Sequence, residues 1–479
     1  MSKKPAPWAA SKQRLSEKTA PAFIPQLNVH PYLDAFVGSY QEGLHGERIL
    51  DGGMMNLVAI GGEGNVGKST IMNGMALSAM AHHPSLYLST FDTESSFKTS
   101  RMRLLAERYP ELEHEDWHSG EGRYQLFSSS STHTGDKWHE DLRRFCAEKE
   151  KDKKMIGTTP FRDLKKEGNV PMTLHYPSLF LLDSLSKFHS GAIIDKLDKN
   201  NIDDKENNAV YMQDSLHKTK MLDELSNTLP RSNTYVIMAM HVGEEINLNG
   251  QPQRKKLIHM RQGSKFKNVP KNVEFLTNHC WDIMRAAPLY NSDRSAVFYP
   301  LKGLEGSISK NDLNEITIQG LRNKSGPSAV PFTIVVSQAQ GVLWGLSCYH
   351  FLTRFNYGVE SPRSNYYELA FYPGKTYGRT TIREDIDQDP KLDRALALMA
   401  EIAVCIMYRD DFPRKYRLKL KEVYEKVKEL GYDWDKILDS RGYWMFKEEE
   451  GSLEHVKPYL CGLDLIRIAI GEHEDPRFK

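Results

Sequence analysis

The stretch 59-AIGGEGNVGKST-70 decides how the chain folds. Its spacing, Gly62-x4-Gly67-Lys68-Ser69, is typical of a loop that cradles phosphate groups. Glycines let the backbone approach the phosphates, while N–H groups of the loop and of the following helix hold the anion. Lys68 would reach the β and γ phosphates, and the Ser69 hydroxyl would coordinate Mg²⁺. The candidate nucleotide-binding residues are Gly62, Glu63, Gly64, Asn65, Val66, Gly67, Lys68, Ser69 and Thr70.

The flanking residues favour this interpretation over a chance glycine-rich turn. The apolar run 54–60 is typical of a strand buried on both faces, and 70–81 has the composition of a helix. Further apolar runs alternate with helical segments, which predicts an α/β fold with a mainly parallel, doubly wound sheet. The expected strands cover residues 54–60, 85–92, 124–131, 178–185, 234–241, 315–322 and 331–337, the last two as hairpins that extend the sheet.

The 479 residues suffice for one core domain with smaller additions. Residues 152–177 are lysine-rich, carry turn residues and lack a clear period, so we expect a surface insertion there. After about residue 345 the chain becomes polar, aromatic and turn-rich, and helical spacing returns later. The expected parts are an N-terminal arm for oligomerisation (1–49), a core domain (50–345), a linker or irregular extension (346–390) and a small helical C-terminal domain (391–479).

Composition excludes several classes of protein. Hydrophobic residues make up 39% of the chain and the net charge is +1, so local charge matters more than the total. The five cysteines include no CxxC pair, which argues against a disulfide framework or a zinc site and suits a reducing cytoplasm. The most apolar helical stretch, 394–408, is too short to cross a bilayer. We therefore expect a cytoplasmic protein without a membrane partner.

Three polar residues lie at the ends of expected strands. Glu94 follows the strand 85–92 and could orient and deprotonate an attacking water, although a solvated turn acid is the alternative. Asp183, after four apolar residues, is the expected Mg²⁺-positioning carboxylate, although such an Asp can also cap a helix. His241 closes the strand 234–241 and could contact the γ phosphate, or could simply be a hydrogen-bonded residue at the edge of the core.

The stretch 247–273 contains seven Lys and Arg residues and no Asp or Glu. Such segregation in a balanced chain predicts a positive patch that suits a nucleic-acid backbone, with Phe266 available for base contact or wedging. A solvated basic loop is the alternative. The candidate DNA-binding residues are Arg254, Lys255, Lys256, Arg261, Lys265 and Lys267.

Arg322 and Lys324 stand two residues apart at a strand end, so their side chains point the same way. Such a pair could reach the γ phosphate of a neighbouring subunit's nucleotide. An ordinary surface charge pair is the alternative.

The ordered set of motifs resembles the RecA family, and within it the bacteriophage UvsX-type recombinases. The set comprises the phosphate loop, the Asp-x-Glu at 92–94, the Leu-Leu-Asp-Ser at 181–184, a strand that ends in His241, the basic stretch, and Arg-Asn-Lys at 322–324. The resemblance covers about residues 50–340. It implies a RecA-like P-loop ATPase core that takes ATP and Mg²⁺.

The resemblance assigns roles to individual residues. It implies phosphate binding by Lys68, a Mg²⁺ site at Ser69 and Asp183, and water activation by Glu94. It likewise implies γ-phosphate sensing by His241, with Arg322 and Lys324 acting across the subunit interface. Arg101 stands where the family often has a tyrosine stacked on the adenine, and its guanidinium plane could stack there instead, which makes it a further candidate nucleotide-binding residue. The segments after Asp183 (187–208) and after His241 correspond to two mobile DNA-binding loops, and residues 20–25 to a subunit-docking segment.

The resulting functional hypothesis is an ATP-dependent recombinase that forms helical filaments on single-stranded DNA, with double-stranded DNA as the pairing partner. Such a protein would act in homologous pairing and strand exchange, and its location would be the host cytoplasm if a phage encodes it. One alternative is a DnaB-like hexameric replicative helicase. The Asp-x-Glu signature argues against it, and so does the expected lack of the sizeable N-terminal domain that such helicases use to assemble. A nucleotide-gated scaffold or mediator is the second alternative.

Overall fold

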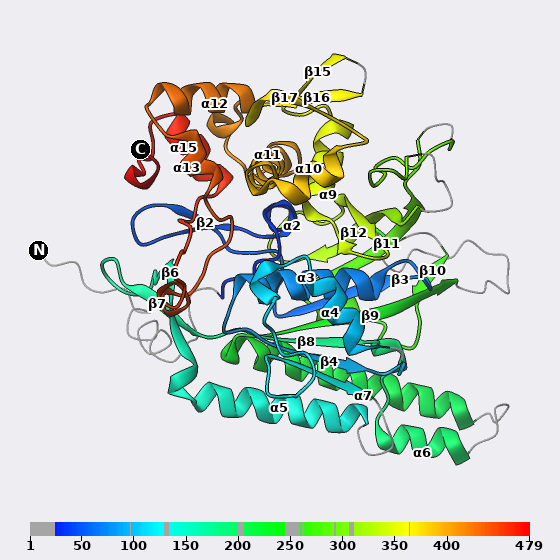
Figure 1. Cartoon of the computed structure of the whole chain (residues 1–479). Helices are drawn as coiled ribbons and strands as arrows, with labels where there is room; N and C mark the ends of the chain where they lie inside the picture. The colour runs from blue at the N-terminus through cyan, green and yellow to red at the C-terminus, as the bar shows by residue number, and fades with distance from the viewer. Residues whose placement is uncertain are drawn as a thin grey trace, which may run out of the picture.

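The computed structural model describes residues 24–95, 97–128, 134–199, 206–244, 259–260, 263–291, 294–305, 311–363 and 365–479. Within these ranges a mixed sheet of ten strands forms the centre of the molecule (Figure 1). The strand order is β14-β13-β12-β11-β3-β9-β8-β4-β5, and β10 pairs with the end of β9. The six strands from β11 to β5 are mutually parallel. The prediction of an α/β fold with a mainly parallel sheet is confirmed.

The parallel strands are β3 (Leu57–Gly62), β4 (Tyr87–Asp92), β5 (Tyr124–Ser128), β8 (Ser178–Asp183), β9 (Thr234–Glu244) and β11 (His279–Pro288). The antiparallel strands are β10 (Ser264–Phe266), β12 (Leu313–Asn323), β13 (Pro331–Ser337) and β14 (Gly341–Val342). The two strands expected as hairpins therefore do extend the sheet, as β12 and β13. Strand β11, which joins them to β3, was not expected.

Side chains of β3 alternate between two hydrophobic clusters. Leu57 and Ala59 belong to one cluster, and Val58 and Ile60 belong to the other. Because successive side chains of a strand point to opposite faces, a strand covered on both sides reads as one continuous apolar run. This explains why the run that precedes the phosphate loop shows no alternation with polar residues.

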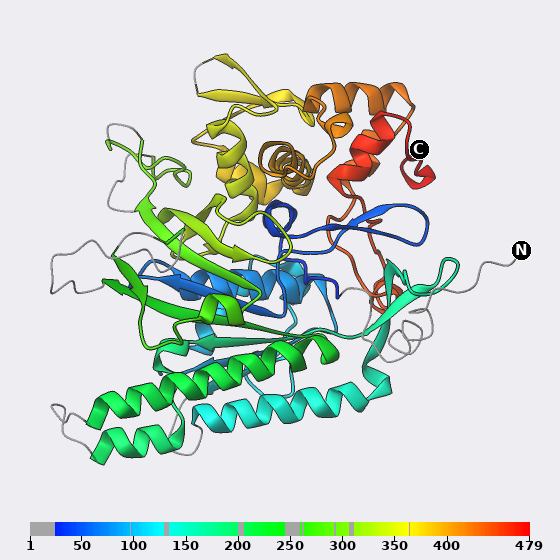
Figure 2. The ribbon, with the colours of Figure 1, turned by 180° about the vertical axis from the view of Figure 1, so that it is seen from behind.

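Helices cover both faces of the sheet. The cluster of Leu57 and Ala59 includes residues of α5 (Gly135–Lys151) and α7 (Glu206–Thr228), and the other cluster includes residues of α3 (Lys68–His82) and α4 (Thr99–Ala106). Helices α5, α6 (Gly191–Lys199) and α7 lie below the sheet in both views, whereas the C-terminal helices lie above it (Figures 1 and 2). The short α8 (Val273–Leu276) precedes β11.

The C-terminal residues form helices, as the sequence predicts, but their core is shared with the N-terminal part. The helices are α11 (Pro390–Tyr408), α12 (Leu420–Glu429), α13 (Trp434–Leu438), α14 (Lys447–Gly451) and α15 (Gly462–Ala469). Helix α11 packs on α2 (Pro31–Val37), and both belong to the same buried cluster as α3. Buried Glu401 of α11 accepts hydrogen bonds from the Tyr40 hydroxyl and from the Gly462 N–H, each at 2.7 Å.

The N-terminal arm lies partly outside the described residues. From residue 24 onward it is packed, with α2 entirely buried and β1 (Tyr40–Glu42) paired to β2 (Arg48–Leu50). Of the segment 20–25, which we expected on a neighbouring subunit, only Ile24 and Pro25 are described. The Pro25 carbonyl accepts a hydrogen bond from the Tyr235 hydroxyl of β9 in the same chain, at 2.9 Å.

The expectation of irregular structure at 346–390 is wrong. Residues 346–390 are no linker, because they contain most of α9 (Trp344–Arg354), a three-stranded sheet and α10 (Ile382–Gln388). The strands of that sheet are β15 (Val359–Arg363), β16 (Tyr366–Leu369) and β17 (Tyr372–Gly378). Residues 152–177 form a hairpin of β6 (Ile156–Arg162) and β7 (Pro171–His175), whose Phe161 is fully buried against Trp444. Buried and partly exposed positions alternate along β6, a pattern that the surrounding lysines obscure in the sequence.

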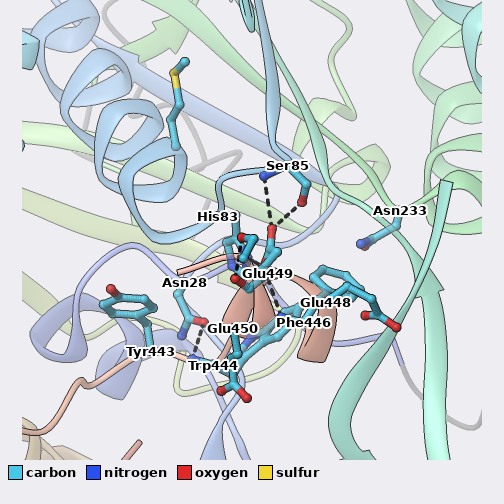
Figure 3. Close-up of polar contacts among 12 residues, drawn as sticks. Asn28, His83, Ser85, Asn233, Tyr443, Trp444, Phe446, Glu448, Glu449 and Glu450 are labelled. Carbon is cyan, nitrogen blue, oxygen red and sulfur yellow. Dashed lines mark hydrogen bonds and ion pairs between the residues drawn. The ribbon is translucent and has the colours of Figure 1, made fainter. Parts of the chain in front are cut away.

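The C-terminal segment reaches back to the helix that follows the phosphate loop (Figure 3). The Glu449 carboxylate lies 3.0 Å from His83 Nδ1, just past the end of α3, and accepts the Ser85 N–H at 3.2 Å. The Trp444 N–H donates to the Asn28 side-chain oxygen at 3.2 Å. These contacts join residues more than 360 positions apart, so the C-terminal helices belong to the same packed body as α3 and the N-terminal segment.

Short 3-10 helices complete the described chain: η1 (Pro110–Leu112), η2 (Lys153–Met155), η3 (Leu185–Lys187), η4 (Leu229–Ser232), η6 (Arg414–Tyr416) and η7 (Pro476–Phe478). Within the ranges that the structure describes, none of the helices combines the length and the apolar surface needed to cross a bilayer.

Candidate functional site

The loop between β3 and α3 makes its turn with two left-handed residues, Asn65 (φ 58°) and Gly67 (φ 90°). Gly67 is the N-cap of α3, and no side-chain hydrogen bond caps this 15-residue helix. Glycine has no side chain that could cap the helix, so no N-cap side chain competes with an anion for the first N–H groups of α3. A Cβ added at Gly64 would meet no atom within 4 Å, so the loop borders open space at that residue.

The Lys68 side chain folds back over this loop. Its ammonium donates to the Gly62 carbonyl at 3.1 Å and to the Glu63 carbonyl at 2.6 Å. Burial lowers the pKa of Lys68, while the negative charges of Asp183 and Glu94 oppose that shift. The ammonium therefore lies within electrostatic reach of both expected carboxylates.

Ser69 and Asp183 meet directly, as the resemblance implies. The Ser69 hydroxyl donates to an Asp183 carboxylate oxygen at 2.5 Å. Burial raises the pKa of Asp183, and the charges of Glu94 and Asp92 raise it further, whereas the Ser69 hydrogen bond and Lys68 lower it. A hydroxyl and a carboxylate are oxygen ligands of the kind that Mg²⁺ prefers, and a cation here would offset the repulsion among the three carboxylates. The donor set thus fits Mg²⁺.

Glu94 is positioned by the turn that follows β4. The buried Asp92 carboxylate accepts the Glu94 N–H at 2.8 Å and the Phe97 N–H at 2.6 Å, so it holds this turn in place. The Glu94 carboxylate lies 2.8 Å from His241 Nε2 and 3.6 Å from Lys187 Nζ. Burial raises the pKa of Glu94, but the His241 hydrogen bond and the Lys187 charge outweigh it, so the net shift is downward. Glu94 is therefore poised as a carboxylate.

His241 lies next to the phosphate loop, because β9 pairs with β3 in the register Gly62↔His241. The same strand lies between β3 and β8, so His241 is on the strand that separates the strand of the phosphate loop from the strand of Asp183. The strand does not end at His241 as expected but continues to Glu244, where it pairs with β10. The His241 side chain is 29% exposed.

Several neighbours of Asp183 contact the site, and the sequence analysis assigned them no role there. The Ser184 hydroxyl donates to Glu94 at 3.2 Å, and the Ser186 hydroxyl accepts the His241 N–H at 2.8 Å. Together with Lys187, these residues follow Asp183 at the carboxyl end of β8. Their closeness to Asp183 in the sequence was the signal that could have identified them, because the ends of parallel strands meet at one edge.

The basic stretch is described only in part. Arg254, Lys255, Lys256 and Arg261 lie outside the described residues, whereas Lys265 in β10 and Lys267 just after it are exposed. Phe266 does not project for base contact, because its ring packs so closely on β3 that a Cβ at Gly61 would lie 2.3 Å from it. The first expected loop, 187–208, is not a simple loop, since it contains α6 and the beginning of α7.

Arg101, on α4, makes contacts other than those expected for a residue that stacks on adenine. Its guanidinium donates to the main-chain carbonyls of Gln338 and Ala339, between β13 and β14. These bonds hold the side chain against the antiparallel part of the sheet.

Arg322 and Lys324 lie apart from the other candidate residues of the same chain. Strand β12 runs antiparallel to β11, so its final residues pair with the beginning of β11 and face away from the phosphate-loop edge. The Arg322 guanidinium donates to the Glu274 carbonyl at 2.9 Å and lies 5.3 Å from the centre of the Phe275 ring. The structure thus brings together Lys68, Ser69, Glu94, Asp183 and His241, and leaves Arg101, Arg322 and Lys324 outside this group.

No protein-family model matches the chain, and no curated protein matches it significantly.

Proposed function

We propose that the chain is a P-loop ATPase of the RecA type, and more specifically an ATP-dependent recombinase that forms filaments on single-stranded DNA. The convergence of five side chains at one edge of a parallel sheet carries the proposal. They come from the loop after β3, from α3, and from the carboxyl ends of β4, β8 and β9: Lys68, Ser69, Glu94, Asp183 and His241.

Each residue has a role that its contacts support. Lys68 and the first N–H groups of α3 would bind the phosphates of ATP, while Ser69 and Asp183 would hold Mg²⁺. The bound cation would neutralise charge on the phosphates. Glu94, ionised and hydrogen-bonded, would orient the attacking water and accept its proton. His241 would exchange its Glu94 contact for the γ phosphate and thereby report whether that group is present.

The placement of two further candidates supports an oligomer. Arg322 and Lys324 face away from the phosphate-loop edge of their own chain, so any contact with nucleotide would be with that of a neighbouring subunit. A helical filament or a ring would provide this arrangement. The exposed Lys265 and Lys267 follow the strand of His241 and would contact the DNA backbone, so binding should weaken steeply with salt.

The ATPase proposal is tested with Glu94→Gln. Removing the base should lower ATP turnover at least about 100-fold while nucleotide affinity stays similar, because general-base catalysis contributes about 10²–10⁴. Turnover would be measured by phosphate release, and affinity with a fluorescent nucleotide. Glu107→Gln, an exposed carboxylate at the end of α4, is the matched control and should behave as wild type. Equal turnover in both variants would remove Glu94 from the mechanism and favour a nucleotide-gated scaffold.

The recombinase proposal is tested by electron microscopy with single-stranded DNA and a slowly hydrolysed ATP analogue. Continuous helical filaments are expected, and Lys68→Ala should abolish them because a lost charged hydrogen bond costs about 1.5–3 kcal/mol. Closed rings on the DNA would instead indicate a helicase of the DnaB kind. A strand-exchange assay on preparations that form filaments would complete the test.

A further inference from the structure

The segment 264–268, called here the β10 segment, contains Lys265 and Lys267, two of the three described lysines of the basic stretch, and is tied to the candidate site at three points. The Phe266 ring covers Gly61, the residue before the phosphate loop. The Lys267 N–H donates to the His241 carbonyl at 2.8 Å. The Lys267 carbonyl accepts the Ser186 hydroxyl at 2.9 Å, and Ser186 also accepts the His241 N–H. The His241 carbonyl is therefore bonded directly to Lys267, and the His241 N–H is linked to Lys267 through the Ser186 hydroxyl.

The segment is held at its far end by a buried lysine of α7. Lys218, 1% exposed, donates to the Asn268 carbonyl at 2.7 Å and lies 2.8 Å from an Asp214 carboxylate oxygen. Asp214, 3% exposed, lies 3.1 Å from His189 Nδ1 through its other oxygen. Since His189 follows η3, the Asp214–Lys218 pair contacts both of the segments that leave the carboxyl ends of β8 and β9.

A buried ion pair often stabilises a protein no more than apolar residues of similar size would, because removing both charges from water costs free energy. The contacts of the Asp214–Lys218 pair suggest a more specific role, because its polar atoms are directed at the two segments that border the candidate nucleotide site. The opposite end of β8 offers a comparison. There Lys149 of α5, equally buried, donates to the Ser178 hydroxyl at 2.7 Å and touches neither segment.

We propose that Asp214 and Lys218 are positioning residues that form a brace, and that Ser186 and this brace together couple His241 to Lys265 and Lys267. The brace fixes Asn268 while Lys267 follows the backbone at His241. Because both ends of the segment are held, a displacement of His241 would change the direction of the Lys265 and Lys267 side chains. In an unbraced loop, flexible residues would absorb the same displacement. The part of this inference that makes nucleotide the trigger rests on the proposed function, whereas the bracing itself does not.

The test combines Asp214→Leu with Lys218→Met in one chain, which removes both charges and leaves no unpaired ion. The control is Lys149→Met, the same substitution at an equally buried lysine away from the segments. Hydrogen exchange of the full chain without nucleotide should be at least about tenfold faster across residues 263–268 in the double variant, with the control like wild type. Unchanged exchange at 263–268 would overturn the brace. A global loss of protection would move the test to Ser186→Ala, with the same expectation for 263–268.

The coupling is tested in the same variants with a slowly hydrolysed ATP analogue. Wild type should change its protection at 263–268 on binding, while the double variant should bind equally well but lose most of that change. Stimulation of ATP turnover by single-stranded DNA should fall about tenfold with basal turnover unchanged, because coupling of sites is typically 5–150-fold. An undiminished response in the double variant would overturn the coupling. If wild type bound no nucleotide, the proposed function and the trigger would both fail, and the exchange without nucleotide would still decide the brace.

Discussion

At the scale of single residues, two glycines of the phosphate-loop region have opposite surroundings. A Cβ at Gly61 would lie 2.3 Å from the Phe266 ring, whereas a Cβ at Gly64 would meet nothing within 4 Å. Neither residue is glycine because of its φ, since neither is left-handed. Gly61 is required by the close approach of β10, and Gly64 leaves space where the proposed phosphates would lie.

We predict that Gly61→Ala destabilises the protein and Gly64→Ala does not. The first change should lower the free energy of unfolding by about 1–3 kcal/mol, because the Phe266 ring and with it β10 must move. The second should leave stability within about 0.5 kcal/mol but weaken nucleotide binding, because a methyl group would occupy the phosphate space. Urea unfolding and a nucleotide titration measure the two effects. Equal stability losses would show that the loop is packed differently at these positions.

At the scale of elements, α5 buries a lysine against the first residue of β8. Burial lowers the pKa of Lys149 to about 7, against an opposing effect of Cys146. The folded-state pKa thus lies below that of the unfolded chain, about 10.4. Between these values the unfolded chain binds more protons, so this group makes the protein more stable as pH rises from 7 towards 10. Below pH 7, Lys149 is charged in the folded state as well, so the full free-energy cost of burying this charge opposes folding.

We therefore predict that Lys149→Met flattens the dependence of stability on pH. In wild type, the titration of Lys149 should raise the free energy of unfolding by at most about 1.4 kcal/mol per pH unit between pH 7 and 10. The variant should lack this contribution. The difference in unfolding free energy between variant and wild type, measured in urea at pH 7, 8 and 9, should shrink as pH rises. A constant difference would mean that Lys149 keeps its ordinary pKa in the folded state.

At the scale of the whole molecule, the C-terminal helices and the sheet form one core. Fully buried Trp444 donates its indole N–H to the Asp51 carbonyl at 2.7 Å, and the Tyr459 hydroxyl accepts a hydrogen bond from the Leu50 N–H at 2.8 Å. Glu449 meets His83 beyond the end of α3. Removal of these partners would expose α2 and leave several buried polar groups unpaired.

We predict that a chain ending at residue 390 does not fold cooperatively. Its α2 would lose the apolar surface of α11, and an unpaired buried polar group costs about 1–3 kcal/mol. The fragment should bind a hydrophobic dye and show no sharp thermal transition, whereas the full chain should melt in one step. A cooperative transition in the fragment at the full-chain temperature would show that residues 391–479 are an independent domain.

Local patterns in the sequence predicted the centre of the fold and of the candidate site. The apolar runs located β3, β4, β8, β9 and β13 to within a few residues, because a strand covered on both faces needs consecutive apolar side chains. The contact of Ser69 with Asp183 agrees with the shared Mg²⁺ site that the resemblance implies, whereas the hydrogen bond between Glu94 and His241 was not predicted. Strand β11 was missed because its buried half contains His279 and Asp282 and its second half is exposed, so no continuous apolar run marks it.

The sequence by itself determined where the phosphate-type loop lies and which side chains stand at the strand ends, because these depend on neighbours a few residues apart. Only the tertiary structure decided that β9 lies between β3 and β8, that Phe266 packs on Gly61, and that Lys218 joins Asn268 to Asp214. Likewise, only the tertiary structure merged residues 391–479 with the N-terminal segment. Each of these contacts joins segments whose local composition is compatible with several partners, so the choice is made by the packing of the whole chain.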